Sequence, residues 1–139
     1  MRDCIFCQIV EGKIPSARIH EDDHCLAFLD INPLQPGHTL VIPKTHYELL
    51  TDMPPDAVAA VTSVLPRIAR AVVATTHAEG FNILQTNGSC AGQVVGHVHF
   101  HIIPRRGGDK LGFRWKAGEY AEGQLEDYCR EIKANLELV

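Results

Sequence analysis

Histidine alternates with apolar residues between positions 96 and 104, and this pattern constrains the fold more than any other in the chain. The imidazoles stand at His97, His99 and His101, and valine, phenylalanine and isoleucine follow them in turn. Successive side chains of a β-strand point to opposite faces, so the alternation predicts a strand with all three imidazoles on one face and a buried apolar face. We expect Pro104, which has no N–H to donate, to mark the end of this strand.

The remaining periodicity predicts a single α+β domain over residues 1–139, with five strands in an antiparallel sheet. We expect helices at 4–10 and 122–138, strands at 18–21, 25–30, 38–42 and 81–86, and a helical stretch at 55–77. Asp3 is the expected cap of the first helix, and Pro66 should kink or break the long helical stretch. In the last helix we expect the apolar face to point toward the core, with Leu125, Tyr128, Cys129, Ile132 and Leu136 inward.

The charge and the apolar runs limit the classes of partner. A net charge of −4 provides no general basic field for nucleic acid polymers or anionic membranes. No apolar run approaches the ~18 residues of a membrane span, because Pro66, Arg67 and Arg70 close the best candidate, which begins at Ala57. The start of the chain shows no hydrophobic signal segment, so we expect a cytoplasmic protein. The chain has five cysteines, two of them in a C-x-x-C pair. In the reducing cytoplasm such a pair favours metal or redox chemistry over a structural disulfide.

The C-x-x-C pair, Cys4 and Cys7, predicts a metal site, because at helical spacing the two thiols share one face. A tetrahedral zinc site needs two more ligands, and we expect His46, after the third strand, and His97, at the near end of the triad. The alternative ligands that stay open are Cys25, Cys90, His20, His24 and His77. A redox C-x-x-C is a second alternative, although no βαβ pattern surrounds it. A zinc ion held in this way would be structural and would leave the other two triad histidines free.

The glycine-containing loop before the triad, Asn87–Val94, indicates a phosphate site next to His99. A neutral imidazole can attack an electrophilic phosphorus and form a phosphohistidine, provided that an acceptor holds its other ring nitrogen. The glycines allow close approach of the backbone to an anion, and Asn87, Ser89 and Gln93 add side-chain donors. Without the histidines, the same loop would be interpreted as a flexible turn between two strands.

Asp30 closes the second strand just before the Asn32-Pro33 turn. Its carboxylate could accept two hydrogen bonds from the vicinal hydroxyls of a ribose. A carboxylate at such a position is otherwise an ordinary turn residue, so Asp30 alone does not identify a ligand.

Together these residues resemble the histidine triad (HIT) family. The signature segment is Gly92–Ile103, which contains a Gly-Gln pair and the triad. Three further blocks match in order and spacing: Ile5–Cys7, Phe28–Asp30 and His38–His46. The resemblance covers about residues 3–106 and is greatest to the Hint-like branch of small nucleotide hydrolases and phosphoramidases. Residues 107–139 form a variable tail with a helix.

The resemblance implies a HIT-like fold with a five-stranded antiparallel sheet, a long central helix and a C-terminal helix, in a homodimer that joins two such sheets. It implies that purine nucleotides bind and that His99 attacks the α-phosphorus, giving a nucleotidylated enzyme that water resolves. The implied substrates are purine nucleoside 5′-phosphoramidates or related nucleotide conjugates. Dinucleoside polyphosphate hydrolysis and a zinc-stabilised nucleotide-binding regulator with little catalysis are alternatives. A further alternative is a catalytic metal ion held by two triad histidines.

The catalytic residues implied by the resemblance are His99, His101, His38 and Gln93. The implied nucleotide-binding residues are Asp30 at the ribose, Phe6, Phe28 and Ile31 near the base, and Asn87, Ser89, Gln93, Val94, His99 and His101. The resemblance also implies a zinc ion on Cys4, Cys7, His46 and His97, the set that ligand geometry favours. Val94 departs from the pattern, because many relatives have serine or threonine at this position. Only its backbone N–H is then available to a leaving group.

Overall fold

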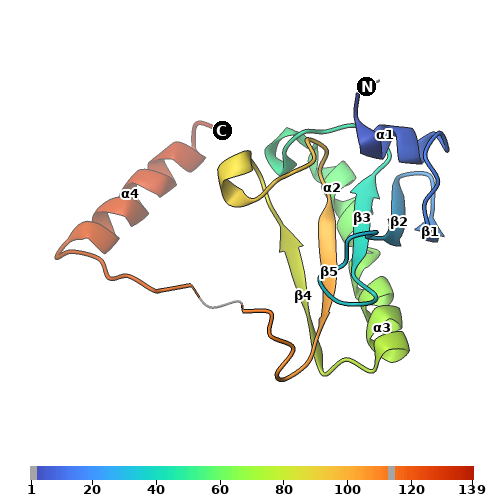
Figure 1. Cartoon of the computed structure of the whole chain (residues 1–139). Coiled ribbons are helices and arrows are strands. Elements are labelled where there is room, and N and C mark those ends of the chain that lie inside the picture. The colour runs from blue at the N-terminus through green and yellow to red at the C-terminus, as the bar shows by residue number, and fades with distance from the viewer. Residues whose placement is uncertain (1–2, 113–114) are drawn as a thin grey trace.

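The computed structural model describes residues 3–112 and 115–139, and its centre is an antiparallel sheet with the strand order β1-β2-β3-β5-β4 (Figure 1). The strands are β1 (Arg18–Glu21), β2 (Cys25–Leu29), β3 (Thr39–Pro43), β4 (Gly80–Gln85) and β5 (Phe100–Arg105). The helices are α1 (Ile5–Val10), α2 (Pro55–Thr62), α3 (Leu65–Thr76) and α4 (Gln124–Leu136), with 3₁₀ turns at Leu50–Asp52 and Ser89–Ala91. The predicted α+β class and five-stranded sheet are confirmed. Met1 and Arg2 lie outside the described residues. The prediction that the start of the chain is not a signal segment therefore stays a prediction.

Two clusters of buried side chains cover the two faces of the sheet. Helices α2 and α3 pack on one face, and α1 packs on the other (Figure 1). The first cluster comprises Cys25, Ala27, Val41, Met53, Val61, Leu65, Ile68, Ala69, Val72, Val98, Phe100 and Ile102. The second comprises Phe6, Ile9, Leu26, Phe28, Leu40 and Ile42. The central strands β2 and β3 are apolar along nearly their whole length because both of their faces are buried.

The long helical stretch is divided into α2 and α3 at Ser63 and Val64, which confirms the predicted break. Pro66 lies in the first turn of α3, where the missing N–H would have no helical partner in any case. By length and hydropathy alone, Pro55–Thr76 is the one candidate membrane span among the described residues. Its buried side chains belong to the first cluster, as expected of helices that cover a sheet.

Only part of the histidine triad lies on a strand. β5 begins at Phe100, and His97 lies in a bend before it, so the prediction of one strand carrying all three imidazoles is wrong. The physical reason is that Val98 donates its N–H to the carbonyl of Tyr47, in the irregular segment after β3, at 2.8 Å. The predicted alternation still holds, because the apolar residues between and after the histidines are buried in the first cluster.

Two predicted element ends are also wrong. β5 continues through Pro104 to Arg105, because Pro104 lies beyond the last pairing with β3, where a missing N–H is tolerated as at a sheet edge. The cap of α1 is Cys4 instead of Asp3, and its Sγ accepts the N–H of Cys7 at 3.4 Å. The first cysteine of the C-x-x-C pair therefore also fixes the start of the helix that carries the second.

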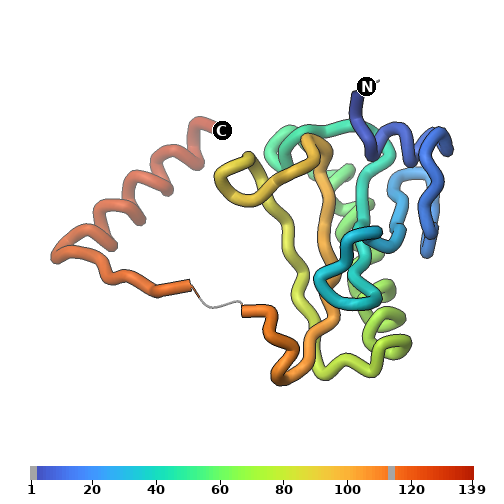
Figure 2. Tube along the Cα trace, in the orientation of Figure 1, coloured from blue at the N-terminus to red at the C-terminus, as the bar shows by residue number. Residues whose placement is uncertain are grey.

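After β5 the chain leaves the sheet, and α4 stands apart from it on the side of β4 (Figures 1 and 2). α4 lies within the predicted range, but none of its residues is buried. The prediction that its apolar face points toward the core is therefore wrong for this single chain, since Leu125, Tyr128, Cys129, Ile132 and Leu136 are all exposed. An apolar stripe at helical spacing on an otherwise uncovered helix is typical of an interaction surface.

Candidate active site and metal site

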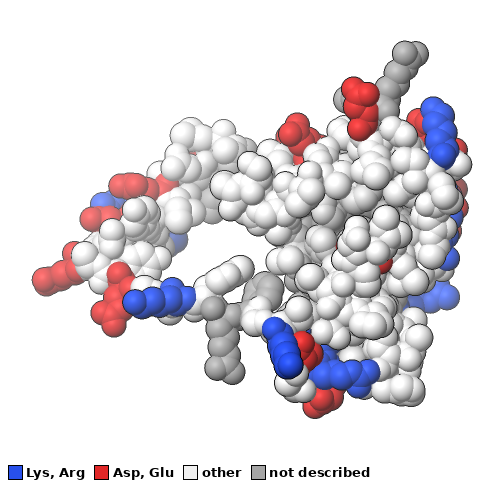
Figure 3. Space-filling view, viewed as in Figure 1, with Lys and Arg blue, Asp and Glu red and all other residues white. Residues whose placement is uncertain are grey.

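A pocket of about 400 Å³ opens on the face of the sheet that carries α1. Most acidic and basic side chains lie at the edges of the molecule and on α4 when it is viewed toward this face (Figure 3). The predicted site residues that line the pocket are Phe6, Phe28, Asp30, Ile31, Val94, His99 and His101. Mostly apolar walls with a few polar groups are typical of a small-molecule site.

His99 is held in one tautomer at the β5 end of this pocket. Its Nδ1 lies 2.7 Å from the carbonyl oxygen of His97. Because a carbonyl oxygen only accepts, Nδ1 carries the proton and Nε2 keeps the lone pair. Phe6 packs edge-on against the ring, with the centroids 5.1 Å apart. His99 is only 6% exposed and yet lines the pocket, so its ring is fixed and its free lone pair suits nucleophilic attack.

A chain of hydrogen bonds also fixes the tautomer of His101. Leu34 donates its N–H to Nδ1 of His38 at 3.1 Å. Nε2 of a neutral His38 must then carry the proton, which it donates to Nδ1 of His101 at 2.9 Å. The proton of a neutral His101 is consequently on Nε2, and its ring centroid lies 4.9 Å from that of His99. The site thus pairs a nucleophilic nitrogen with a hydrogen-bond donor.

Burial keeps this pair of linked imidazoles neutral. Desolvation is the main cause that lowers the pKa of His101 to about 4, and the nearby His99 and His38 lower it further. Burial lowers the pKa of His38 as well, against an opposing effect of the Asp30 carboxylate, whose Oδ2 lies 3.8 Å from Nε2 of His38. Neutral rings are the forms that the hydrogen-bond chain requires.

The lowered pKa of His101 predicts that stability falls in acid. An unfolded chain binds the proton below an ordinary histidine pKa of about 6.5, whereas the folded protein binds it only near pH 4. The free energy of unfolding should therefore be highest above about pH 6.5 and decrease as the pH falls toward 4. Urea titrations of the metal-free protein across this range measure the slope. The variant His101→Asn, which keeps an acceptor for His38, should flatten it, and an unchanged slope would contradict the assignment.

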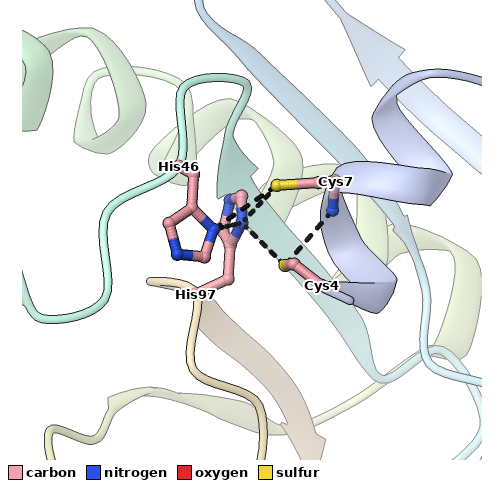
Figure 4. Close-up of side chains that lie close together, drawn as sticks. All are labelled: Cys4, Cys7, His46 and His97. Atoms are coloured by element: carbon pink, nitrogen blue, oxygen red, sulfur yellow. Dashed lines mark hydrogen bonds between the residues drawn. The ribbon is translucent and has the colours of Figure 1, made fainter. Parts of the chain in front are cut away.

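Four side chains converge where α1 meets the segment after β3 and the bend before β5 (Figure 4). Nδ1 of His97 lies 3.4 Å from Sγ of Cys4 and 3.6 Å from Sγ of Cys7. Nδ1 of His46 lies 3.4 Å from Sγ of Cys7 and 3.2 Å from Nδ1 of His97. Ligands around a tetrahedral zinc ion, at ~2.3 Å for sulfur and ~2.0 Å for nitrogen, are separated by about 3.3–3.8 Å. The donor set therefore fits this ion.

The surroundings prepare His97 for metal binding. Its Nε2 donates to the carbonyl oxygen of Pro43 at 2.8 Å, which leaves the Nδ1 lone pair facing the cluster. Burial is the main cause that lowers the pKa of His97 to about 4, so the ring is neutral at pH 7. Burial likewise raises the pKa of the Cys7 thiol, with a further contribution from Cys4. The alternative ligands considered from the sequence, Cys25, Cys90, His20, His24 and His77, are not part of this cluster.

The side-chain amides of Asn87 and Gln93 hold the loop before the triad in place through hydrogen bonds to the backbone. Oε1 of Gln93 accepts the N–H of Gly88 at 2.7 Å, and its Nε2 donates to the carbonyl of Glu48 at 2.8 Å. Oδ1 of Asn87 accepts the N–H of Leu50 at 2.7 Å. Neither amide lines the pocket, nor does Ser89, and the loop reaches it through Gly92, Val94 and Val95. Contacts of Asn87, Ser89 and Gln93 with phosphate stay predictions.

Several pocket residues were not predicted from the sequence. They are Ile5, Ile9, Ile14, Pro15, Ser16, Leu29, Asn32, Leu40, Gly92 and Val95. The apolar spacing in α1 could have indicated Ile9, because it lies on the buried face with Phe6. The segment before β1 carries no comparable signal, and only the folded sheet brings Ser16 to the pocket.

Comparison with known proteins identifies the family. Residues 11–108 match the HIT domain, and the chain belongs to the HIT family. It is 50% identical over 109 residues to adenylylsulfatase HINT3 of Arabidopsis thaliana, covering 78% of this chain but only 55% of that protein. It is 40% identical over 136 residues to adenosine 5′-monophosphoramidase HNT1 of Saccharomyces cerevisiae, covering 96% of this chain and 83% of that protein. A zinc-bound histidine triad family protein from Mycobacterium smegmatis has a TM-score of 0.76 and 46% identity, covering 96% of this chain and 98% of that one.

Proposed function

We propose that the protein hydrolyses purine nucleoside 5′-phosphoramidates or related nucleotide conjugates at the α-phosphate, through a covalent nucleotidyl intermediate on His99. The observation that carries this proposal is the fixed pair of imidazoles: a lone pair on Nε2 of His99 beside a proton on Nε2 of His101. Relatives named for phosphoramidase and adenylylsulfatase activities support AMP conjugates as the class of substrate.

The order of the strands supports the orientation of such a ligand. His101 on β5 pairs with Leu40 on β3, which pairs with Phe28 on β2. The Asp30 carboxylate lies within 4.8 Å of a ring nitrogen of His101, whereas the backbone of Phe28, two strands away at ~4.8 Å per strand, lies about 10 Å from that of His101. This separation suits a mononucleotide with its phosphate at β5, its ribose hydroxyls at Asp30 and its base against apolar walls.

Two displacements complete the proposed reaction. Nε2 of His99 bonds to the α-phosphorus as the phosphorus–nitrogen bond to the leaving amine breaks, and the amine takes a proton from solvent as it departs. The Nε2–H of His101 donates to a phosphoryl oxygen and stabilises its charge. Water then attacks the phosphorus and releases one proton to solvent as the bond to Nε2 of His99 breaks. The nucleoside monophosphate leaves, and His99 is again neutral with its proton on Nδ1.

A comparison of substrates tests this proposal. We expect the protein to release AMP from adenosine 5′-phosphoramidate faster than from diadenosine tetraphosphate, with chromatography of the products as the measurement. Faster cleavage of the dinucleotide would instead support a dinucleoside polyphosphate hydrolase. Binding of AMP without turnover of either compound would support the nucleotide-binding regulator.

We also propose that the Cys4, Cys7, His46 and His97 cluster holds a structural zinc ion. The spacing of its donor atoms supports this proposal, as does the zinc-bound relative. When bound, the ion would supply a cross-link between α1 and the segments that flank β3 and β5. Because this cluster uses only the first histidine of the triad, His99 and His101 stay free of the metal.

We further propose a homodimer in which a second copy covers α4 and continues the sheet at β4. β4 is an edge strand, and its Phe81 and Ile83 are exposed. The uncovered stripe of α4 lies on the same side of the sheet. Light scattering should give about twice the 15.4 kDa mass of the chain.

Disruption of the α4 stripe tests the dimer. We expect Ile132→Asp combined with Leu136→Asp to halve the mass, because two buried carboxylates would be strongly unfavourable in an apolar interface. Glu131→Gln, on the same helix, serves as the matched control and should leave the dimer intact. A wild-type protein that is monomeric at high concentration would refute the proposal.

A further inference from the structure

A second group of metal-binding side chains lies at the turn between β1 and β2, outside the pocket and the C-x-x-C cluster. His20 comes from β1, Asp22 from the turn and Cys25 from the start of β2. Nε2 of His20 lies 2.9 Å from Oδ2 of Asp22, and Sγ of Cys25 lies 3.3 Å from the same oxygen. Each residue offers one ligand atom, and the three atoms lie within 4.8 Å of one another.

The backbone of the turn prepares the Asp22 carboxylate for this arrangement. Its Oδ1 accepts the N–H groups of His24 and Cys25, both at 2.8 Å. These bonds fix the plane of the carboxylate, so that Oδ2 faces the imidazole and the thiol. The hydrogen bond from His20 is the main cause that holds the pKa of Asp22 well below its usual range, so the group is a carboxylate at pH 7.

We propose that His20, Asp22 and Cys25 form a second site for a divalent transition-metal ion of the zinc type. An imidazole, a carboxylate and a thiolate are three ligands that zinc accepts, and water can complete a tetrahedron. Tetrahedral geometry requires about 3.3 Å between nitrogen and oxygen ligands and about 3.5 Å between sulfur and oxygen. The nitrogen–oxygen pair and the sulfur–oxygen pair therefore need to separate by only a few tenths of an ångström.

The charges and protons of this site balance when the ion binds. Burial raises the pKa of the Cys25 thiol to about 12, so the ion itself displaces this proton to solvent. The proton of His20 that faces Asp22 moves to Nδ1, which leaves the Nε2 lone pair for the ion. One thiolate and one carboxylate then neutralise the two charges of the ion, which favours binding at a partly buried position. The Lys44 ammonium is already paired with Glu21 at 2.7 Å.

Two of the three side chains of this site are open to solvent. The side chains of His20 and Asp22 are 26% and 35% exposed, whereas Cys25 is fully buried. His20 also lines a cavity of about 160 Å³ between β1 and α3, together with Ile68 and Arg67. Water can therefore reach the ion from the side of His20, whereas the buried Cys25 thiolate would bind it from the protein interior.

Cobalt(II) binding to the metal-free protein tests the proposal, because cobalt follows zinc geometry and shows a sulfur charge-transfer band when a thiolate is bound. We expect two equivalents per chain in the wild type. Cys4→Ser combined with Cys7→Ser should leave one equivalent with a thiolate band. Adding Cys25→Val to this variant should remove the remaining equivalent and its band.

A second variant guards against a folding defect at the buried position. His20→Phe in the same Cys4→Ser, Cys7→Ser background should weaken the remaining binding at least about tenfold without touching the core. His24→Gln, which changes an exposed histidine of the same turn, is the matched control and should have no effect. One equivalent in the wild type, or residual binding insensitive to both Cys25→Val and His20→Phe, would overturn the proposal and leave a purely hydrogen-bonded turn.

Discussion

His99→Ala is expected to lower the turnover of adenosine 5′-phosphoramidate by about 10⁴-fold or more, because it removes the only proposed nucleophile. AMP binding should persist, since the apolar walls and Asp30 remain in place. Release of AMP under single-turnover conditions measures the first effect, and calorimetric titration with AMP measures the second. Loss of turnover with retained binding is the combination that a nucleophile, and not a binding residue, produces.

The matched control for this substitution is His24→Ala, an exposed histidine of the β1–β2 turn. It should retain full activity, and both variants should keep the wild-type circular dichroism spectrum. Turnover by His99→Ala within tenfold of the wild type would contradict the covalent pathway. Chemical trapping offers an independent measurement: the wild-type protein should carry acid-labile AMP during turnover, and His99→Ala should carry none.

Removal of zinc is expected to lower the melting temperature by about 10 °C or more while sparing the chemical step. A structural zinc site contributes several kcal/mol to folding, and each kcal/mol corresponds to a few degrees for a chain of this size. Cys7→Ser should have the same effect as a chelator, because it breaks the contacts to both imidazoles. Calorimetric melting with and without chelator measures the shift.

The turnover number distinguishes a structural ion from a catalytic one. At a temperature where the stripped protein stays folded, kcat should remain within about twofold, because His99 and His101 belong to no part of the cluster. Immediate loss of activity with the fold intact would favour a catalytic metal on the triad. Cys90→Ser, which changes an exposed cysteine outside the cluster, should leave the response to chelator unchanged.

The sequence predicts the candidate site best where the residues have distinctive ligand chemistry and also stand at a characteristic spacing along the chain. A tetrahedral site built on the C-x-x-C pair needs two further ligands, and the fold brings the two histidines that the sequence predicts, His46 and His97, next to the pair; metal binding by the four stays a prediction. Apolar periodicity likewise predicts the five strands and the broken helix with small errors at their ends. These features depend on residues that are near neighbours or that repeat with a fixed period.

Features that depend on the backbone or on another molecule could not be predicted in this way. The N–H of Leu34 determines the tautomer of His101 through His38, and a backbone donor leaves no trace in residue types. The bond from Val98 to Tyr47 similarly delays the start of β5. The apolar stripe of α4 was assigned to the core because periodicity identifies a covered face without identifying what covers it.

Helix α1 gives the two sites a mechanical connection. This helix of six residues places Cys7 in the Cys4, Cys7, His46 and His97 cluster, and its Phe6, which precedes Cys7, packs against His99. We expect this shared helix to couple the two sites, and thermodynamic reciprocity then makes each ligand change the affinity of the other by the same factor. Zinc-loaded protein should bind AMP with a lower Kd than stripped protein, and saturating AMP should lower the Kd for zinc by the same factor. Metal supply in the cell would thereby set how readily this pocket fills.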